Sequence, residues 1–322
     1  MADRCHLVGC DSVGTKRCSA CEVASYCSVS CQREDWKVHK RSCVNISKLP
    51  TTLLPLSELN KSMAKMYDLQ DILESQGRVK EAITLLERYL EFLEHQYGVQ
   101  VEGSSHYRRS NGDLCDNVPL IAIRIMIATK YNSIENADAA LAHGKKTRQM
   151  LEHNDRSNDS TLLSLCSTER IVADAYRIRQ QLDAAEYHCE QSLMFARLIK
   201  GEGRITEEYR SLLMFSDLRR FQSRYPEAID FAEQAYILVS GTYGPVHPAV
   251  QGAASQLIQH LIANGDYSRA DDYCRMNYEN LTDPRNGVDQ KGSAVADGMS
   301  QIAYIWLSKP PVDDEDAAFA LA

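Results

Sequence analysis

The first 43 residues concentrate the side chains that bind transition metals. Their spacing is C-x4-C-x7-C-x2-C-x5-C-x3-C-x7-H-x3-C, and the eight positions are Cys5, Cys10, Cys18, Cys21, Cys27, Cys31, His39 and Cys43. A structural zinc site takes four such ligands, so eight of them supply two sites. A segment of this length buries too little apolar area to fold by itself. We therefore predict a small zinc-stabilised module that holds two structural Zn²⁺ ions.

The ligand count also bears on the chemistry of these metal sites. A catalytic zinc keeps one coordination position open for water, whereas two four-coordinate ions use all eight ligands here. His6 lies beside Cys5 and is a ninth candidate, but we interpret it as a bystander because the count closes without it. The sites are therefore expected to be structural, and the chain is not expected to be an enzyme.

Spacing alone leaves open whether the two sites follow one another or interleave. The array that ends in Cys31-Gln-x2-Asp-Trp36, His39 and Cys43 resembles the MYND-type zinc fingers over residues 5–43. That resemblance implies a cross-brace. One zinc would take Cys5, Cys10, Cys27 and Cys31, and the other would take Cys18, Cys21, His39 and Cys43. The first two ligands are four residues apart here, where two is commonest in the family.

A short helix is expected in the second half of this module. Gln32, Trp36, His39 and Cys43 recur at spacings of 4, 3 and 4, which places them on one helical face. MYND-type fingers are similar in binding short proline-containing peptides, and the resemblance implies that Gln32 and Trp36 line the peptide pocket. Tryptophan offers a flat apolar face, and the glutamine amide can pair with a peptide backbone. Alternatively, Trp36 only fills the small core between the metal sites.

Beyond the module, the sequence is helical in pattern. Apolar residues recur at spacings of three and four from Leu56 onward, while Pro50 and Pro55 interrupt any helix before it. We divide the chain into a zinc finger at 1–45, a linker at 46–55, helical repeats at 56–308 and a tail at 309–322.

An alanine marks an internal repeat in the helical part. It recurs 43 residues on from Ala185 to Ala228 and 42 residues on from Ala228 to Ala270. Ala82 fits the same place, and Ala140 fits it in a looser unit. Its small side chain would let two antiparallel helices approach closely. We predict five helix pairs, at 56–98, 117–153, 161–199, 206–241 and 247–281, and a capping helix at 293–308.

Glycine or asparagine follows sixteen residues after the repeated alanine in four of these units. The residues are Gly98, Gly201, Gly244 and Asn286. Both types tolerate the left-handed backbone conformation that ends many helices, so we expect each to end the second helix of its pair. The polar segment 98–117, which has no helical period, is expected to be an insertion.

The segments 243–250 (YGPVHPAV) and 265–270 (GDYSRA) resemble the long tetratricopeptide repeats of kinesin light chains. This resemblance covers residues 56–308. It implies an all-α tetratricopeptide-like superhelix, in which neighbouring pairs share one elongated core. A generic helical bundle is the alternative.

Charge and composition limit the classes of partner that this chain is expected to bind. The chain has 36 basic and 44 acidic residues, a formal charge of −8, and this excludes the basic footprint that nucleic-acid binding requires. The acidic bias of the helical part indicates a solvated surface, with a basic partner in its groove as the alternative. No apolar run reaches the length of a membrane span. Singly scattered cysteines and the lack of a signal segment favour cytoplasmic and/or nuclear residence.

Together these features predict a zinc-binding adaptor for protein–protein interaction. The finger would take a short proline-containing peptide and the helical array a second protein, with no nucleic acid, membrane or small-molecule substrate. MYND fingers also occur in SET-type protein lysine methyltransferases, and this is the alternative. Such enzymes need a strand-rich SET fold with an Asn-His-Ser-Cys-x-Pro-Asn type of motif, which this sequence lacks.

Overall fold

The computed structural model describes residues 5–7, 9–21, 23–40, 43, 52–100, 104–110, 112, 114–283 and 285. By their internal contacts, the residues form two compact units, Met1–Asp155 and Arg156–Ala322. The predicted capping helix at 293–308, the predicted tail and Asn286 lie outside the described residues.

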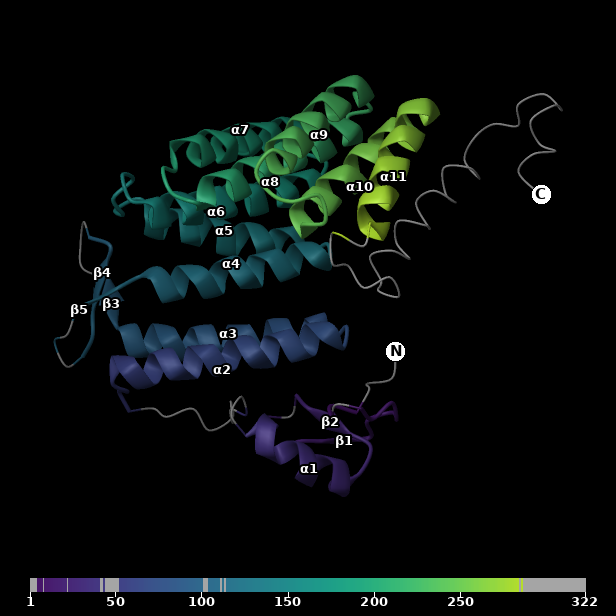
Figure 1. Ribbon diagram of the computed structural model, residues 1–322. Coiled ribbons are helices and arrows are strands. Elements are labelled where there is room, and N and C mark those ends of the chain that lie inside the picture. The colour runs from purple at the N-terminus through teal and green to yellow at the C-terminus, as the bar shows by residue number, and fades with distance from the viewer. Residues whose placement is uncertain are drawn as a thin grey trace. The chain divides into compact units, whose positions relative to one another are not determined.

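The N-terminal module is built from two short strands and one helix. Strands β1 (Lys16–Arg17) and β2 (Ser25–Tyr26) pair antiparallel, and α1 (Val29–His39) follows them (Figure 1). Ser28 caps the helix, because its hydroxyl accepts a hydrogen bond of 3.2 Å from the Cys31 amide. Cys43 lies beyond the helix, yet its amide donates to the His39 carbonyl at 2.9 Å.

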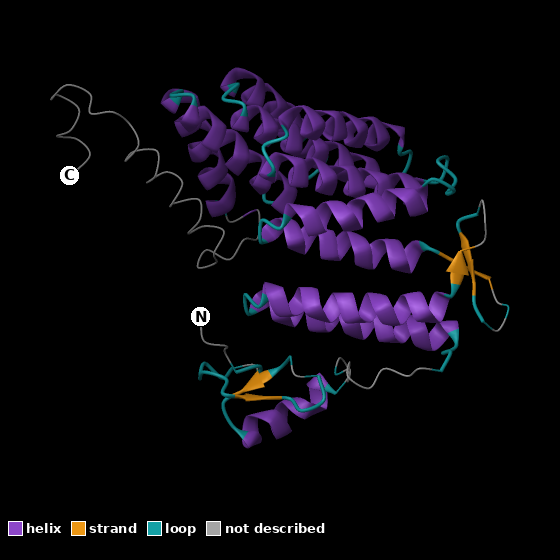
Figure 2. Cartoon of the chain, turned by 180° about the vertical axis from the view of Figure 1, so that it is seen from behind, coloured by secondary structure: helices purple, strands orange, loops and turns teal. Residues whose placement is uncertain are grey.

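Helices α2 to α11 make five antiparallel pairs, which agree with the predicted pairs to within a few residues (Figures 1 and 2). In Met1–Asp155 the pairs are α2 (Leu56–Ser75) with α3 (Val79–Tyr97) and α4 (Val118–Ser133) with α5 (Ala137–Leu151). In Arg156–Ala322 they are α6 (Asp159–Ile178) with α7 (Leu182–Leu198), α8 (Gly203–Phe221) with α9 (Tyr225–Ser240), and α10 (Pro248–Ala263) with α11 (Tyr267–Thr282).

The repeated alanine is a core residue in all five pairs. Its exposed fraction is at most 1% at Ala82, Ala140, Ala185, Ala228 and Ala270. Each lies near the start of the second helix of its pair. Around Ala185, for example, the core includes Ala173 of the partner helix and Phe215 of the next pair. The repeated alanine therefore belongs to the packed interior of each pair.

The turn inside each pair has the same left-handed geometry. The residue five positions before the repeated alanine has φ between 59° and 80°, and the residues are Gly77, Glu135, Gln180, Ser223 and Gly265. After each of them the next amide bonds back to a carbonyl five residues earlier, as in Asn136 to Tyr131 at 2.9 Å. This is a Schellman motif, which satisfies the last carbonyls of the first helix. The sequence places glycine at only two of these five positions.

The glycines sixteen residues after the repeated alanine were expected to end the second helices in a left-handed conformation. This expectation is right at one position and wrong at two. Gly98 ends α3 with φ of 77°, and a Cβ there would lie 2.4 Å from the Arg108 carbonyl oxygen. Gly201 and Gly244 do not have a left-handed φ. At Gly201 the backbone instead serves as a donor, because its amide and that of Lys200 bond the Asp159 carboxylate at 2.8 and 3.1 Å.

The insertion at 98–117 contains a small sheet that the sequence did not predict. Strands β3 (Val99–Gln100), β4 (His106–Arg108) and β5 (Leu114–Asp116) form an antiparallel sheet in that order (Figure 2). Buried Arg109 ties the insertion to its surroundings, donating to the Gln96 carbonyl at 3.0 Å and to the Leu54 carbonyl at 2.5 Å.

One buried arginine joins the N-terminal module to the first helix pair. The Arg78 guanidinium donates to the Val23 carbonyl at 2.5 Å and to both carboxylate oxygens of Glu81, at 2.9 and 2.7 Å. Arg17 also binds Glu81, at 3.0 Å. The module therefore contacts the helical part through hydrogen bonds as well as through the chain that links them.

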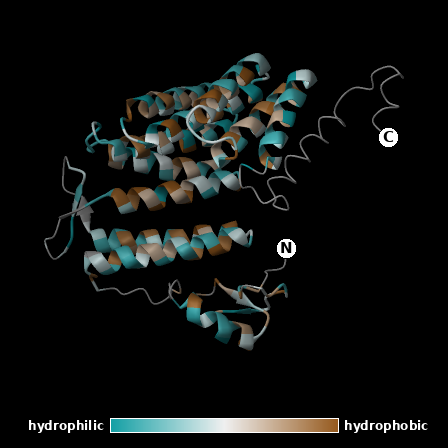
Figure 3. Cartoon of the chain, in the orientation of Figure 1, coloured by the Kyte–Doolittle hydropathy of each residue, from teal (hydrophilic) through white to brown (hydrophobic). Residues whose placement is uncertain are grey.

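Hydropathy follows the packing of the helices. Apolar and polar residues share each helix in Figure 3, as expected for helices that bury one face. Within the part of the chain that the structure describes, no helix combines the length and apolar character needed to cross a membrane.

Candidate metal centre and peptide-binding face

The eight ligand candidates gather in two groups of four. Cys5, Cys10, Cys27 and Cys31 form one group, and Cys18, Cys21, His39 and Cys43 form the other. In each group the sulfur and nitrogen atoms lie within 4.8 Å of one another. The groups interleave along the sequence, which is the cross-brace arrangement. Loops beside β1 and β2 supply most of the cysteines, while α1 supplies Cys31 and His39.

The distances within these groups suit tetrahedral zinc. With Zn–S bonds of about 2.3 Å, neighbouring sulfurs in a tetrahedron lie about 3.8 Å apart. The Sγ atoms of Cys10 and Cys27 are 3.7 Å apart, and those of Cys18 and Cys43 are 3.8 Å apart. Cys21 Sγ lies 3.5 Å from His39 Nε2. Each group can therefore coordinate one metal ion with four ligands.

Burial makes these thiols dependent on a cation. It raises the pKa of the Cys21 and Cys43 thiols and lowers the pKa of His39. At Cys10, by contrast, a hydrogen bond from the Ser12 backbone is the main cause that lowers the pKa to about 7. Buried thiolates need a compensating positive charge, and a divalent metal ion supplies it.

A second layer of polar residues surrounds His39, and sequence reasoning did not assign it. Asp35 is 3% exposed, accepts a hydrogen bond from the Tyr26 hydroxyl at 2.7 Å and lies 2.7 Å from His6 Nδ1. Ligand-type atoms of His6, Asp35 and His39 lie within 4.8 Å of one another. A carboxylate beside a metal-binding histidine commonly orients the ring. His6 thus lies outside both four-ligand groups. The position of Asp35 in the Cys-Gln-x2-Asp-Trp stretch was the sequence signal that could have pointed to this residue.

The two residues expected to line the peptide pocket lie on α1. Trp36 is 44% exposed, and its ring meets the His39 ring edge-on at 5.8 Å between centroids. Gln32 is half-buried one turn earlier on the same helix. Trp36 therefore covers one metal ligand with part of its surface and offers the rest to solvent. A tryptophan that only filled the core would be buried, as Tyr26 is.

A family model agrees with this geometry. The model of the MYND finger matches residues 5–43, which is the span of the eight ligands. Residues 5–43 form a MYND zinc finger. The cross-brace, the short strand pair and α1 are thus the fold of a known zinc module, and zinc is the metal that the two groups are expected to bind.

Curated relatives match mostly through the MYND finger. A SET and MYND domain-containing protein of Dictyostelium discoideum is 49% identical over 37 residues, 12% of this chain and 7% of the relative. Tudor domain-containing protein 1 of Oryzias latipes is 51% identical over 39 residues, 12% of this chain and 3% of the relative. The N-lysine methyltransferase SMYD2 of Gallus gallus is 25% identical over 146 residues, 43% of this chain and 33% of the relative. The chain thus spans a third or less of these relatives.

Solved structures match the helical part. A signal transduction ATPase with a tetratricopeptide repeat sensor, from Pyrococcus horikoshii, matches with a TM-score of 0.50 and 14% identity over 87% of this chain and 38% of that chain. Kinesin light chain TPR-like repeats of Podosopora anserina match with a TM-score of 0.49 and 16% identity over 68% of this chain and 94% of that chain. The helices that follow the MYND finger have a tetratricopeptide-like fold.

Proposed function

We propose that this protein is a zinc-dependent adaptor. Its MYND finger takes a short proline-containing peptide against Gln32 and Trp36, and its tetratricopeptide-like helices take a second protein, in the cytoplasm and/or the nucleus. The observation that carries the proposal is the half-exposed indole of Trp36, on a module whose metal ligands are buried or half-buried. A flat apolar ring fixed by a rigid helix suits a proline side chain.

The proposal assigns one zinc ion to each four-ligand group, with a structural role. Four protein ligands close a tetrahedral site, so neither ion would hold the water that zinc catalysis uses. Asp35 would order the polar layer that it shares with His6 and Tyr26 beside the His39 ring. In this scheme the metals build the scaffold and α1 presents the binding residues.

Two binding sites on one chain favour an adaptor role. A partner that engages both sites gains effective concentration without any new contact. The hydrogen bond from Arg78 to the Val23 carbonyl would limit how far the finger can move relative to α2 and α3.

The methyltransferase alternative rests on the names of relatives that match over the finger and one further stretch. Beyond the finger, the described strands are β3 to β5, each two or three residues long. A SET domain needs a larger sheet than these strands provide. We therefore favour the adaptor, which uses both parts of the chain as they are folded.

A peptide titration tests the role of the finger. The zinc-loaded full chain and its Trp36→Ala variant are titrated with a labelled proline-rich peptide, with Val38→Ala as the matched control. Val38 lies on the same helix and is 66% exposed. We expect Trp36→Ala to weaken binding at least tenfold, about 1.4 kcal/mol, and Val38→Ala to leave it unchanged. Equal affinity for all three proteins, at equal zinc content, would remove the peptide-binding claim.

A further inference from the structure

In Arg156–Ala322, the first helices of neighbouring pairs lie against one another, α6 beside α8 and α8 beside α10. One side of α8 carries Arg210, Asp217, Arg220 and Phe221, whose spacing keeps them on one helical face. Arg210 is 52% exposed, Arg220 40% and Phe221 40%. With Arg170 and Arg177 of α6, these arginines and Phe221 are here named the arginine face.

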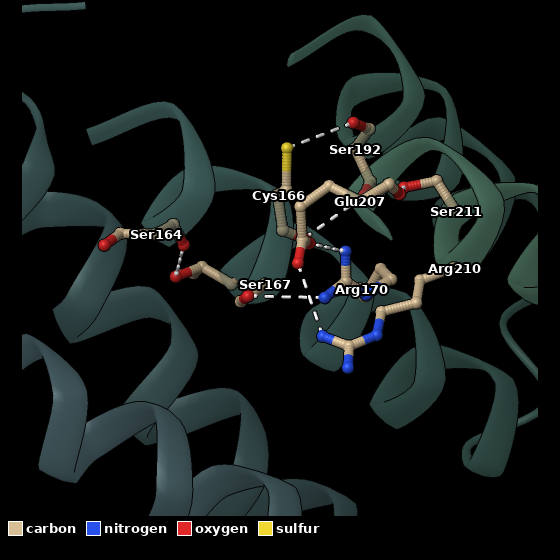
Figure 4. Close-up of polar contacts among 9 residues, drawn as sticks. Ser164, Cys166, Ser167, Arg170, Ser192, Glu207, Arg210 and Ser211 are labelled. Atoms are coloured by element: carbon tan, nitrogen blue, oxygen red, sulfur yellow. Dashed lines mark hydrogen bonds and ion pairs between the residues drawn. The ribbon is translucent and has the colours of Figure 1, made fainter. Parts of the chain in front are cut away.

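At one end of the arginine face, two guanidinium groups share a single carboxylate (Figure 4). Arg170 forms an ion pair with Glu207 and also donates to the Ser167 hydroxyl at 3.3 Å, while Arg210 Nη1 lies 3.4 Å from the other Glu207 oxygen. The Glu207 side chain is only 7% exposed. One positive charge is therefore left over, and it lies on the solvent side because Arg210 is the exposed member.

At the other end, two guanidinium groups flank an aromatic ring. The guanidinium carbons of Arg177 and Arg220 lie 4.4 and 4.9 Å from the centroid of the Phe221 ring. Asp174 accepts from Arg177 at 2.9 and 2.6 Å, and Asp217 lies 3.7 Å from Arg220. Cation–π contacts and these carboxylates hold the arginines in place, and the Arg220 side chain stays 40% exposed.

A buried histidine beside this end has an unused hydrogen-bonding capacity. The His260 side chain is 1% exposed, and within the described residues neither ring nitrogen has a hydrogen-bond partner. Its Nε2 atom lies 4.0 Å from Asp217. Because the ring is buried, a ligand cannot reach it, and the accessible polar groups at this end of the face are Asp217 and Arg220.

The charge of this face differs from that of the chain. The chain as a whole has a formal charge of −8, which on average favours basic partners. On the arginine face, four arginines meet three carboxylates, those of Asp174, Glu207 and Asp217. One surplus positive charge is too little for the phosphate backbone of a nucleic acid. It suits a short segment with a few carboxylates.

We propose that the arginine face binds an extended acidic peptide segment of a partner protein, with one carboxylate at Arg210, a second at Arg220 and an apolar side chain against Phe221. Arg210 and Arg220 are ten residues apart on α8, which is about 15 Å along a helix. An extended chain covers that length in about four to five residues. The inference rests on the proposed adaptor function and names the chemistry of the second partner.

The test uses the zinc-loaded full chain and a labelled peptide with two glutamates about four residues apart, followed by phenylalanine. The variants are Arg210→Glu and Arg220→Glu, with Arg275→Glu as control. Arg275 lies on α11, is 59% exposed and pairs with Asp271. We expect each of the first two variants to weaken binding at least tenfold and the control to stay within twofold. Replacing both peptide glutamates with glutamine should abolish binding, and added salt should weaken it.

Several results would overturn the inference. The glutamine peptide could bind as tightly as the glutamate peptide, or Arg275→Glu could lose as much affinity as the other two variants. Arg210→Glu and Arg220→Glu could also keep the wild-type affinity, with helical circular dichroism unchanged. Trp36→Ala separates this test from the test of the finger. Loss of acidic-peptide binding in Trp36→Ala would place that peptide on the finger and overturn the inference, whereas binding of the proline-rich peptide would still report on the adaptor proposal.

Discussion

The MYND finger and the helix pairs are stabilised in different ways. In the finger, eight side chains gather in two groups, and among its described residues the buried apolar ones besides the cysteines are Val23, Ala24 and Tyr26. In the helix pairs, the core is repeated, with a buried alanine and a left-handed turn in every unit. A finger of this kind depends on each ligand, whereas a repeat array spreads its stability over many contacts between neighbours.

In both regions, the residues that stabilise the fold differ from the residues that are proposed to bind a partner. The residues that would bind metal in the finger are buried or half-buried, and the residues proposed to bind peptide lie on one helix, α1. On the helix pairs, the proposed binding residues lie on the first helices, and the packing residues are buried apolar side chains of both helices of each pair. In both regions a substitution in the scaffold should act on folding, and one on the exposed face should act on binding.

The largest expected effect is loss of a metal ligand. Cys18→Ser should remove the metal of its group and unfold the finger, because a structural zinc contributes about 10–16 kcal/mol. The matched control is Cys274→Ser, since both cysteines are 2% exposed and only the first is in a ligand group. We expect bound zinc to fall only in Cys18→Ser, and the helical circular dichroism of α2–α11 to persist. Unfolding of those helices together with the finger would contradict the comparison.

A smaller effect is expected from enlarging the repeated alanine. Ala140→Leu forces a larger side chain between α4 and α5 and should lower the free energy of unfolding by about 1–3 kcal/mol. Ala142→Leu, on the exposed side of the same helix, is the control and should change it little. Thermal or urea unfolding measures both, and zinc content should stay the same. If the two variants had equal stability, the alanine would not be the packing residue of the pair.

Acid should act on the helices through His260. Burial lowers the pKa of His260 to about 4, below its usual 6.5. Between these values the unfolded chain takes up a proton that the folded chain does not, so stability falls as the pH drops from about 6.5 to about 4. His260→Leu should remove this part of the pH dependence. Urea midpoints at pH 7 and pH 5 for both proteins give the difference, and parallel losses would show that His260 does not contribute.

Much of the fold followed from the sequence because its signals are local. The spacing of apolar residues gave the five helix pairs, and the recurring alanine gave their register. The ligand spacing and the Cys-Gln-x2-Asp-Trp stretch indicated the MYND finger, which the family model and the geometry confirm. The peptide-binding role of Gln32 and Trp36 remains a prediction, since exposure alone shows only that the indole is accessible.

Other features could not be predicted because one residue type can serve different structural roles, and the tertiary contacts decide which role it takes. Glycine was expected to be left-handed sixteen residues after the alanine, yet Gly201 is instead used for its amide, which bonds Asp159. The left-handed position is in the turn, where Glu135, Gln180 and Ser223 take it without glycine. Hydrogen bonds of the Schellman motif and packing of the pair offset the cost of that conformation.

The sequence by itself determined which residues could bind metal, which segments are helical and where the repeats begin, because these depend on the order and spacing of neighbouring residues. Only the tertiary structure decided that Asp35 lies beside His39, that Arg78 reaches the Val23 carbonyl, and that four arginines of α6 and α8 lie on one face of an acidic chain. Those arrangements join residues that are distant in sequence, and the packing of the helices and the finger alone brings them together.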